Sequence, residues 1–282
     1  MQVIPRPAQW QAIRLQLIHS DQTLGLVPTM GALHQGHLDL VSRSLEKCDY
    51  TLVSIFVNPT QFNNPEDFAK YPQSLEQDLK LLEKAGVDAV FLPTVETMYP
   101  SKPRIKLDFG SLEQILEGAS RPGHFNGVGI IVSKLFHMIQ PDIAFFGQKD
   151  LQQVAIIQSL VRELSFPVQL EIVPTRRELD GLAMSSRNRR LSESERKQAL
   201  LLYESLSDAK DLLIKGHAWE KVKKSAETLF EKEEGVTLDY FALVDQEKFE
   251  LLDAYDPAKK SSLCIAAFVG EIRLIDNLPI NA

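Results

Sequence analysis

Residues 24–47 have the sequence LGLVPTMGALHQGHLDLVSRSLEK, and this stretch indicates the fold class. The apolar run at 24–28 has the length of a buried strand. Leu38, Val41 and Leu45 recur at the spacing of one helix face and predict a helix at 37–47. A turn that contains glycine separates the two. A strand, a tight turn and a helix in direct succession are typical of one βα unit of an α/β sheet.

The same alternation continues along the next 130 or so residues. Further strands are predicted at 51–57, 88–92, 142–146 and 168–173, and further helices at 75–85, 128–139 and 151–163. Strands that alternate with helices favour right-handed crossovers and a doubly wound parallel sheet. The near-continuous apolar character of the strands indicates burial on both faces.

The pattern changes after Asp180. Charged, helix-period segments at 192–213 and 218–230 precede three predicted strands at 238–244, 263–269 and 271–275, with a tight turn at Gly270. We therefore predict an α/β protein of two domains. Residues 1–175 form a Rossmann-like domain with a doubly wound parallel sheet, and residues 176–282 form a smaller α+β domain that is a candidate lid.

The composition is that of a globular protein with a sizeable core, because 44% of the 282 residues are hydrophobic and 24% are charged. A net charge of −7 argues against nucleic acid or an anionic membrane as a partner. Cys48 and Cys264 lack metal-site spacing and are predicted to be reduced structural thiols. With no apolar run of about 18 residues and no signal pattern at the N-terminus, we expect a soluble protein, cytoplasmic or organellar, that acts on small molecules.

The first chemical motif is VPTMGALHQGH at 27–37, at the carboxyl end of the first long predicted strand. Open α/β sheets bind ligands at that end. Gly31 permits close approach of the backbone, and the helix N-terminus attracts anions. His34 and His37 are three residues apart and can both donate to phosphate oxygens. On the histidine spacing alone, two surface histidines at a helix start remain an equally good interpretation.

The second motif is DGLAMSSRN at 180–188, directly after the last parallel strand. Two hydroxyls and an arginine can bind a polyphosphate through neutral and charge-assisted hydrogen bonds. Alone, such a loop is more often the cap of a helix. Taken together, the two motifs resemble the HIGH and KMSKS elements of the nucleotidylyltransferase superfamily.

A closer resemblance appears when five segments are taken in order: VPTMGALHQGHLDLV (27–41), FVNPTQFNNPEDFAKYP (56–72), RPGHFNGV (121–128), FFGQKDLQQ (145–153) and DGLAMSSRN (180–188). Together they resemble the pantoate–β-alanine ligase family. The resemblance implies an enzyme that condenses (R)-pantoate with β-alanine through pantoyl adenylate, releasing AMP and pyrophosphate. It implies ATP with Mg²⁺, no organic cofactor, and a homodimer formed by the N-terminal domain, to which an apolar strand at 104–109 is a candidate contributor.

The resemblance also implies roles for individual residues. The catalytic residues are His37, His34, Lys149 and Arg187. The ATP-binding residues are Met30, Gly31, Ala32, Leu33, His34, His37, Gly147, Gln148, Lys149, Asp150, Arg176, Met184, Ser185, Ser186 and Arg187. Gln61 and Gln153 are implied to bind pantoate and β-alanine, and Asp78 is offered as a direct or water-mediated Mg²⁺ ligand. Arg176 departs from the family, which has a small apolar residue against the adenine.

Two other interpretations compete with this one. Another adenylyl- or cytidylyltransferase, or a truncated aminoacyl-tRNA synthetase, shares the first motif, but a synthetase predicts a lysine-bearing second loop and a basic surface. A catalytically silent nucleotide-binding protein predicts the loss of a catalytic position, yet His34, His37, Lys149, Ser185 and Arg187 are all present. Formation of AMP that requires both pantoate and β-alanine discriminates among the three.

Overall fold

The computed structural model describes residues 1–281 and divides into two compact units. The N-terminal unit comprises Met1–Gln148 and Gln152–Pro174, and the C-terminal unit comprises Lys149–Leu151 and the chain from Thr175 onward. The larger hydrophobic clusters lie within single units. Each unit therefore has its own core and is described by itself.

The N-terminal unit is built on a sheet of six strands in the order β1-β4-β3-β2-β5-β6. The strands are β1 (Gln2–Ile4), β2 (Leu24–Thr29), β3 (Tyr50–Ile55), β4 (Ala89–Phe91), β5 (Ile143–Gly147) and β6 (Gln169–Val173). All neighbouring pairs are parallel, which confirms the predicted doubly wound sheet. The chain reverses its order between β2 and β5, so these two neighbours form the topological switch point at which such sheets bind ligands.

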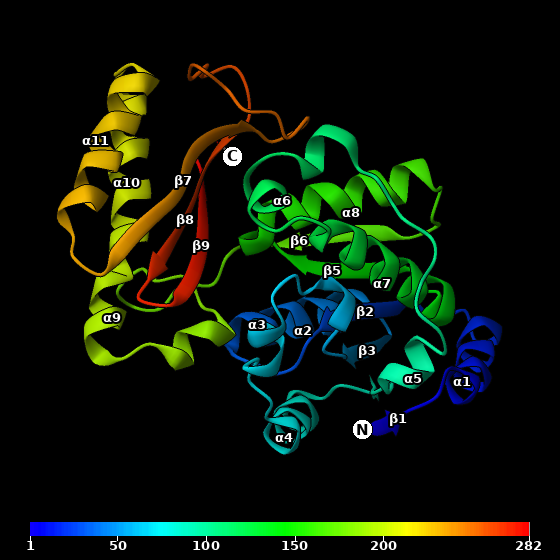
Figure 1. The fold of residues 1–282 in the computed structure, drawn as a ribbon. Helices are drawn as coiled ribbons and strands as arrows, with labels where there is room; N and C mark the ends of the chain where they lie inside the picture. The colour runs from blue at the N-terminus through cyan, green and yellow to red at the C-terminus, as the bar shows by residue number, and fades with distance from the viewer. Residues whose placement is uncertain (282) are drawn as a thin grey trace. The chain divides into compact units, whose positions relative to one another are not determined.

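Helices pack on the two faces of this sheet (Figure 1). One core cluster includes residues of α1, α7 and α8, and the other includes residues of α2 and α4. The α-helices of this unit are α1 (Pro7–His19), α2 (Gln35–Lys47), α3 (Pro65–Ala69), α4 (Leu75–Ala85), α5 (Val95–Met98), α6 (Leu116–Ser120), α7 (His124–Ile139) and α8 (Leu151–Glu163), and the short 3₁₀ turns are η1 (Pro59–Gln61), η2 (Gly110–Glu113) and η3 (Gln148–Asp150). The longer helices agree with the predicted ones, although α2 and α7 begin two and four residues earlier than expected.

Two features of this unit differ from the sequence prediction. The edge strand β1 is not predicted, because three residues are too few to show a pattern. The predicted strand at 104–109 is wrong: this segment pairs with no strand. Its Leu107 N–H donates to Asn126 Oδ1 at 2.9 Å, and Leu107 and Phe109 pack so closely on Gly129 of α7 that a Cβ there would lie 2.8 Å from each. Leu107 and Phe109 therefore contact a helix and not a neighbouring strand, whereas Ile105 is exposed.

The C-terminal unit contains an antiparallel sheet of three strands, β7 (Val236–Asp245), β8 (Ser261–Val269) and β9 (Ile272–Pro279). Its helices are η4 (Ser186–Arg190), α9 (Glu193–Gln198), α10 (Leu200–Ile214) and α11 (Trp219–Lys232), and α10 and α11 run side by side along the sheet (Figure 1). Gly270 has a φ of +56° in the β8–β9 turn, as predicted. The predicted segment 192–213 forms two helices, and the α+β character is confirmed.

Both cysteines are free thiols. Burial raises the pKa of the Cys48 thiol to about 11, with the carboxylates of Asp142 and Asp49 adding to the effect. The thiol therefore stays protonated near neutral pH, which agrees with a structural role. Within residues 1–281, no helix has the length and apolar character that crossing a membrane requires.

Candidate active site

Residues 30–37, here called the histidine turn, run from the end of β2 into the first turn of α2. Gly31 and Ala32 have φ values of +80° and +49°, and the second is uncommon for a residue with a side chain. Two hydrogen bonds stabilise this backbone: Ala32 N–H donates to Asp78 Oδ2 at 2.8 Å and Leu33 N–H to Asp78 Oδ1 at 2.9 Å. The turn is therefore shaped by a carboxylate about 45 residues further along the chain.

Asp78 lies in the first turn of α4 and is 1% exposed. Its Oδ1 also accepts from Ser74 Oγ at 3.0 Å, so three donors stabilise the buried carboxylate. Glycine is favoured at position 31 for two reasons. A Cβ there would lie only 3.1 Å from Asp78 Oδ2, and the positive φ of Gly31 is unfavourable for residues with a side chain. Asp78 thus uses the amides of Ala32 and Leu33, two of the groups expected to line the nucleotide.

The two histidines of the turn contact each other. His34 is the N-cap of α2, and its N–H donates to His37 Nδ1 at 3.3 Å. The ring centroids are 4.1 Å apart. Because Nδ1 of His37 accepts, a neutral His37 carries its proton on Nε2. The backbone therefore selects the tautomer that can donate from Nε2 to a phosphate oxygen.

Gln61 brings the second sequence segment to the histidine turn. Gln61 is buried, and its side-chain Nε2 donates to Met30 Sδ at 3.0 Å. Asn58 Nδ2 donates to Gln61 Oε1 at 3.1 Å, and Tyr99 OH donates to Asn58 Oδ1 at 2.8 Å. Burial raises the pKa of Tyr99, which keeps the phenol protonated as a donor. This chain of hydrogen bonds sets the orientation of the Gln61 amide.

The side chains of Arg121 and His124 contact the backbone carbonyl of Gln61. His124 Nδ1 is 2.7 Å from the carbonyl oxygen of Gln61, which can only accept, so Nδ1 carries the proton. The other ring nitrogen, Nε2, lies 3.2 Å from Arg121 Nη1 and accepts from it. The two side chains therefore position the backbone of Gln61.

Gln152 and Gln153 are neighbours on α8 with different environments. Gln152 is 4% exposed; its Nε2 donates to the carbonyls of Leu112 and Ile115 at 2.7 and 2.9 Å, and its Oε1 accepts from Glu117 N–H. Gln153 is half-buried. The structure thus assigns Gln152 to packing, whereas Gln153 remains the proposed substrate residue.

The carboxyl end of β5 carries the next predicted site residues. Gly147 ends the strand and Gln148 follows it, next to β2 at the switch point of the sheet. Lys149 and Asp150 continue the turn and belong to the C-terminal unit. There the Lys149 carbonyl accepts from Asn277 Nδ2 at 2.8 Å.

Residues 184–188, here called the serine–arginine loop, follow a short hairpin in the C-terminal unit. Met184 N–H donates to the Arg176 carbonyl at 3.0 Å, so that carbonyl forms part of the hairpin. Ser185 is the N-cap of η4 and accepts from Arg187 N–H at 3.3 Å, while Ser186 is buried. The hydroxyls and the guanidinium predicted to bind phosphates thus lie together in one capped turn.

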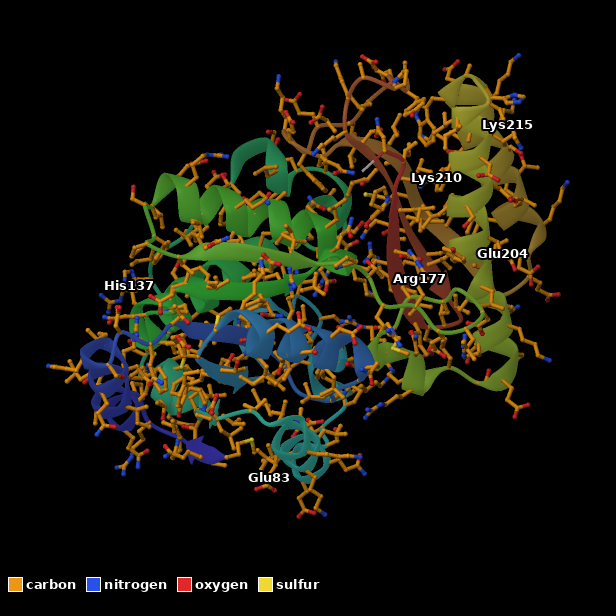
Figure 2. All side chains as sticks on the ribbon, turned by 180° about the vertical axis from the view of Figure 1, so that it is seen from behind. Glu83, His137, Arg177, Glu204, Lys210 and Lys215 are labelled. Atoms are coloured by element: carbon orange, nitrogen blue, oxygen red, sulfur yellow. The ribbon has the colours of Figure 1, made fainter. Side chains whose placement is uncertain are left out.

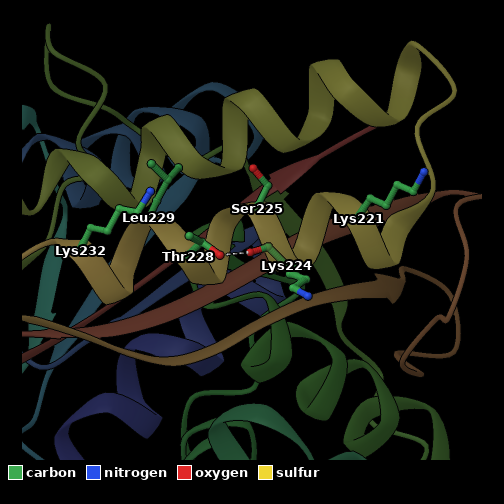
Figure 3. A pocket seen from close by; sticks show the side chains of 6 residues that line it. All are labelled: Lys221, Lys224, Ser225, Thr228, Leu229 and Lys232. Carbon is green, nitrogen blue, oxygen red and sulfur yellow. Dashed lines mark hydrogen bonds between the residues drawn. The ribbon is translucent and has the colours of Figure 1, made fainter.

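A cavity of about 400 Å³ also lies on the surface of α11. It is lined by Lys221, Lys224, Ser225, Thr228, Leu229 and Lys232 of that helix (Figure 3). None of the predicted site residues lines it, and lysines along one helix face are typical of a solvated surface. The cavity is therefore separate from the candidate site.

Comparison with known proteins agrees with the geometry. The family model for pantoate–β-alanine ligase matches residues 2–279. The chain belongs to the pantoate–β-alanine ligase family. This family and the predicted class of enzyme, a ligase, are confirmed.

Individual relatives match over nearly the whole chain. The pantothenate synthetase of Cytophaga hutchinsonii is 46% identical over 96% of this chain and 97% of its own. The crystal structure of pantothenate synthetase from Thermus thermophilus matches with a TM-score of 0.92 and 40% identity, covering 100% of both chains. The pantoate–β-alanine ligase of Francisella tularensis, solved with β,γ-ATP and β-alanine, matches with a TM-score of 0.82 and 33% identity over 99% and 98% of the chains.

A pantoate–β-alanine ligase is expected to use Mg²⁺, but the described residues do not include a cluster of side chains that could bind it. Among residues 1–281, no three His, Cys, Asp or Glu residues are grouped as a metal site. Both oxygens of Asp78 already accept hydrogen bonds within the protein. Asp78 thus fits a direct metal-ligand role poorly, and Mg²⁺ commonly relies on substrate phosphates and water instead.

We expect Asp78→Asn to slow the ligase on the order of tenfold without changing its Mg²⁺ requirement. The amide would present an NH₂ group to one of the two loop N–H donors and leave that buried donor unpaired, at about 1–3 kcal/mol. Activity is measured against Mg²⁺ concentration, and hydrogen exchange at residues 31–34 is measured without metal or nucleotide. Glu76→Gln, an exposed acid on the same helix turn, is the control. An increase in the half-saturating Mg²⁺ concentration with unchanged exchange would restore Asp78 as a ligand.

Sequence reasoning missed several residues that shape this site. Tyr99 and Asn277 have no motif of their own, and the role of Asp78 as an acceptor for the histidine turn leaves no local signal. Each acts through a partner distant in sequence, from 41 residues for Tyr99 and Asn58 to 128 for Asn277 and Lys149. The pattern of hydrophobic and polar residues along the chain cannot reveal hydrogen bonds between residues so far apart in sequence.

Proposed function

We propose that this ligase works in two steps through enzyme-bound pantoyl adenylate. The chain is an ATP-dependent ligase that forms pantothenate from pantoate and β-alanine, as its family and close relatives indicate. The observation that carries the two-step proposal is the histidine turn at the switch point of the sheet, with a backbone hydrogen bond that leaves His37 Nε2 as donor. Open α/β sheets bind ligands at this point of the sheet, which supports the proposal that His37 donates to a phosphate of ATP.

In the first step, the pantoate carboxylate attacks the α-phosphorus of ATP, a P–O bond forms, and the bond to the β-phosphate breaks with release of pyrophosphate. A carboxylate is already ionised at neutral pH, so no general base is required. His34, His37, Lys149 and Arg187 donate to the polyphosphate, and His37 acts most strongly as charge develops in the transition state. Met30 and the turn backbone line the nucleotide.

In the second step, the neutral amine of β-alanine attacks the acyl carbon of the adenylate. The C–N bond forms, the C–O bond to AMP breaks, and the amine proton is lost to solvent. Gln61 and Gln153 bind pantoate throughout, because amides can donate to its carboxylate and pair with its hydroxyls without adding charge. We also propose that the predicted domain at 176–282 acts as a lid that excludes water and so protects the acyl phosphate.

A Mg²⁺ ion that enters with ATP would supply charge neutralisation as pyrophosphate leaves. We further propose that the Asp150 carboxylate accepts a hydrogen bond from a ribose hydroxyl of ATP.

We also propose that the chain forms a cytoplasmic homodimer through its N-terminal unit. The exposed apolar side chain of Ile105, which is 73% accessible, supports a contact on that unit. Sedimentation at micromolar concentration would reveal a monomer if the dimer is wrong.

The neighbouring glutamines on α8 allow a matched test of the pantoate site. Gln153→Ala is expected to raise the pantoate concentration needed for half-maximal rate by about tenfold or more, because a substrate hydrogen bond is lost. Gln152→Ala removes three internal hydrogen bonds and should instead lower the melting temperature. Steady-state kinetics and calorimetry separate the two effects. If Gln152→Ala gives the larger pantoate defect, the assignment of Gln153 is incorrect.

Oxygen labelling tests the adenylate mechanism. Pantoate labelled with ¹⁸O in its carboxylate should transfer one ¹⁸O atom to AMP, because the attacking oxygen stays on the α-phosphorus when the C–O bond breaks. Mass spectrometry of AMP and of the intact protein provides the readout. Unlabelled AMP, or a covalently modified protein, would contradict the proposal and indicate acyl phosphate chemistry or a protein nucleophile.

A further inference from the structure

Arg177 lies in the hairpin before the serine–arginine loop and contacts strand β9 (Figure 2). Its Nη1 donates to Asp276 Oδ2 at 2.6 Å and its Nη2 to Asp276 Oδ1 at 3.0 Å. Asp276 is 5% exposed, and the guanidinium lies 4.3 Å from the ring centroid of Tyr203. Lysine cannot reproduce a bidentate pair that is also stacked on an aromatic ring.

The same guanidinium donates to two backbone carbonyls. Nη1 donates to Gly181 at 3.1 Å, within the hairpin, and Nη2 to Asn277 at 2.9 Å, on β9. Gly181 has a φ of +96°, and a Cβ at this position would overlap the ring of Tyr203. Arg177 thus joins the hairpin backbone to the strand at a place where the ring of Tyr203 packs directly against the hairpin backbone.

The serine–arginine loop is attached to this hairpin at both ends. At its start, Met184 N–H donates to the Arg176 carbonyl at 3.0 Å. At its end, Asn188 Nδ2 donates to the Ala183 carbonyl at 3.0 Å. Any movement of the hairpin relative to β9 would therefore move Ser185, Ser186 and Arg187.

Asn277, the residue after Asp276, holds the turn that carries Lys149, another residue predicted to bind phosphates. It is 2% exposed, and its Nδ2 donates to the Lys149 carbonyl at 2.8 Å. Lys149–Leu151 belong to the same C-terminal unit. Two consecutive residues of one strand thus fix the backbone of Lys149 and, through Arg177, the serine–arginine loop.

We propose that Arg177, Asp276 and Asn277 are positioning residues that hold Lys149 and the serine–arginine loop in one arrangement for binding the ATP phosphates. The inference rests on the proposed function of Lys149 and Arg187 as phosphate donors. Catalysis by placed charges depends on geometry, and a displacement of about 1 Å can cost on the order of 10²-fold in rate. The strand supplies that precision because β9 is hydrogen-bonded along its length to β8.

The first experiment uses Arg177→Lys and Asn277→Asp in the full-length enzyme. Asn277→Asp keeps the size of the side chain but replaces the donor to the Lys149 carbonyl by an acceptor. Both variants should lower pantoate-dependent exchange of pyrophosphate into ATP by about tenfold or more, whereas capture of synthetic pantoyl adenylate by β-alanine changes much less. Asn277→Ala, without the added charge, is the second variant if Asn277→Asp unfolds in calorimetry.

Arg273 provides a matched control on the same strand. Its Nη2 donates to Asp239 at 2.7 Å and its Nε to the same carboxylate at 3.0 Å, with the guanidinium 5.8 Å from the ring centroid of Tyr240. Arg273→Lys therefore removes a two-donor guanidinium contact with a carboxylate from β9, as Arg177→Lys does. It should lower stability by a similar amount but leave pyrophosphate exchange near the wild-type rate.

A double-mutant cycle with Lys149→Ala distinguishes positioning from general destabilisation. If Asn277 acts through Lys149, Asn277→Asp should add little to the exchange defect of Lys149→Ala. Defects that multiply in the double variant, or a normal rate for Asn277→Asp beside an impaired Lys149→Ala, would overturn the inference. A normal exchange rate for Lys149→Ala itself would instead refute the proposed function of Lys149.

Discussion

His37→Ala is expected to lower the rate of adenylate formation by about 10²-fold or more. The His34 N–H donates to His37 Nδ1, which leaves Nε2 as the donating nitrogen of the neutral ring. A donor that acts mainly on the charge developing at the phosphates contributes more to the transition state than to bound ATP. ATP binding should therefore weaken far less than turnover.

Pantoate-dependent pyrophosphate exchange measures the first step, and calorimetric titration measures ATP affinity. His19→Ala, which alters an exposed histidine at the end of α1, is the control for loss of an imidazole. Because His37 also caps α2, melting temperatures of both variants are compared. Near-normal turnover of His37→Ala would remove His37 from the catalytic machinery, and an equal loss of ATP affinity would make it a ground-state binding residue.

Lys149→Ala is expected to impair the first step on the order of 10²-fold and the second step much less. Charge builds up on the polyphosphate only while pyrophosphate leaves, so an ammonium donor matters mainly there. The backbone of Lys149 is fixed by Asn277, so removing its side chain should leave the turn in place. The defect should therefore be one of chemistry and not of folding.

Synthetic pantoyl adenylate separates the two steps, since its capture by β-alanine bypasses adenylate formation. Arg187→Lys should show the same selectivity, because lysine cannot form a bidentate contact with phosphate. Arg189→Lys, an exposed neighbour in η4, is the matched control. Equal losses in both steps would contradict the assignment of Lys149 and Arg187 to the departing phosphates.

The parallel sheet and the histidine turn could be predicted from sequence because they depend on local chemistry. An apolar run, a glycine and a helix-period segment follow one another within residues 24–47, and each limits its own backbone conformation. The end of α4 is similar: Gly86, directly after the predicted helix at 75–85, is the C-cap and adopts a φ of +88°. The predicted strand at 104–109 is wrong because an apolar pattern does not show which element the side chains contact, and here Leu107 and Phe109 pack on α7 while Ile105 is exposed.

The resemblance to pantoate–β-alanine ligases placed candidate residues on the chain but did not assign their contacts. Asp78 matched a position linked to magnesium, yet in the structure it accepts from the amides of Ala32 and Leu33. Gln152 and Gln153 are indistinguishable by residue type, and only packing shows that the first is bonded to the segment around α6. Residue identity limits what a side chain can do, and its environment selects among the possibilities.

By itself, the sequence determined the α/β class, the position of the histidine turn at a strand end, and the family. The tertiary structure alone decided how the site is supported: Arg177 pairs with Asp276 across 99 residues, and Asn277 contacts Lys149 across 128. The physical reason is that backbone preferences and hydrophobic periodicity act over a few residues. A hydrogen bond between distant side chains exists only after the fold has brought them together, and no local pattern specifies its partner.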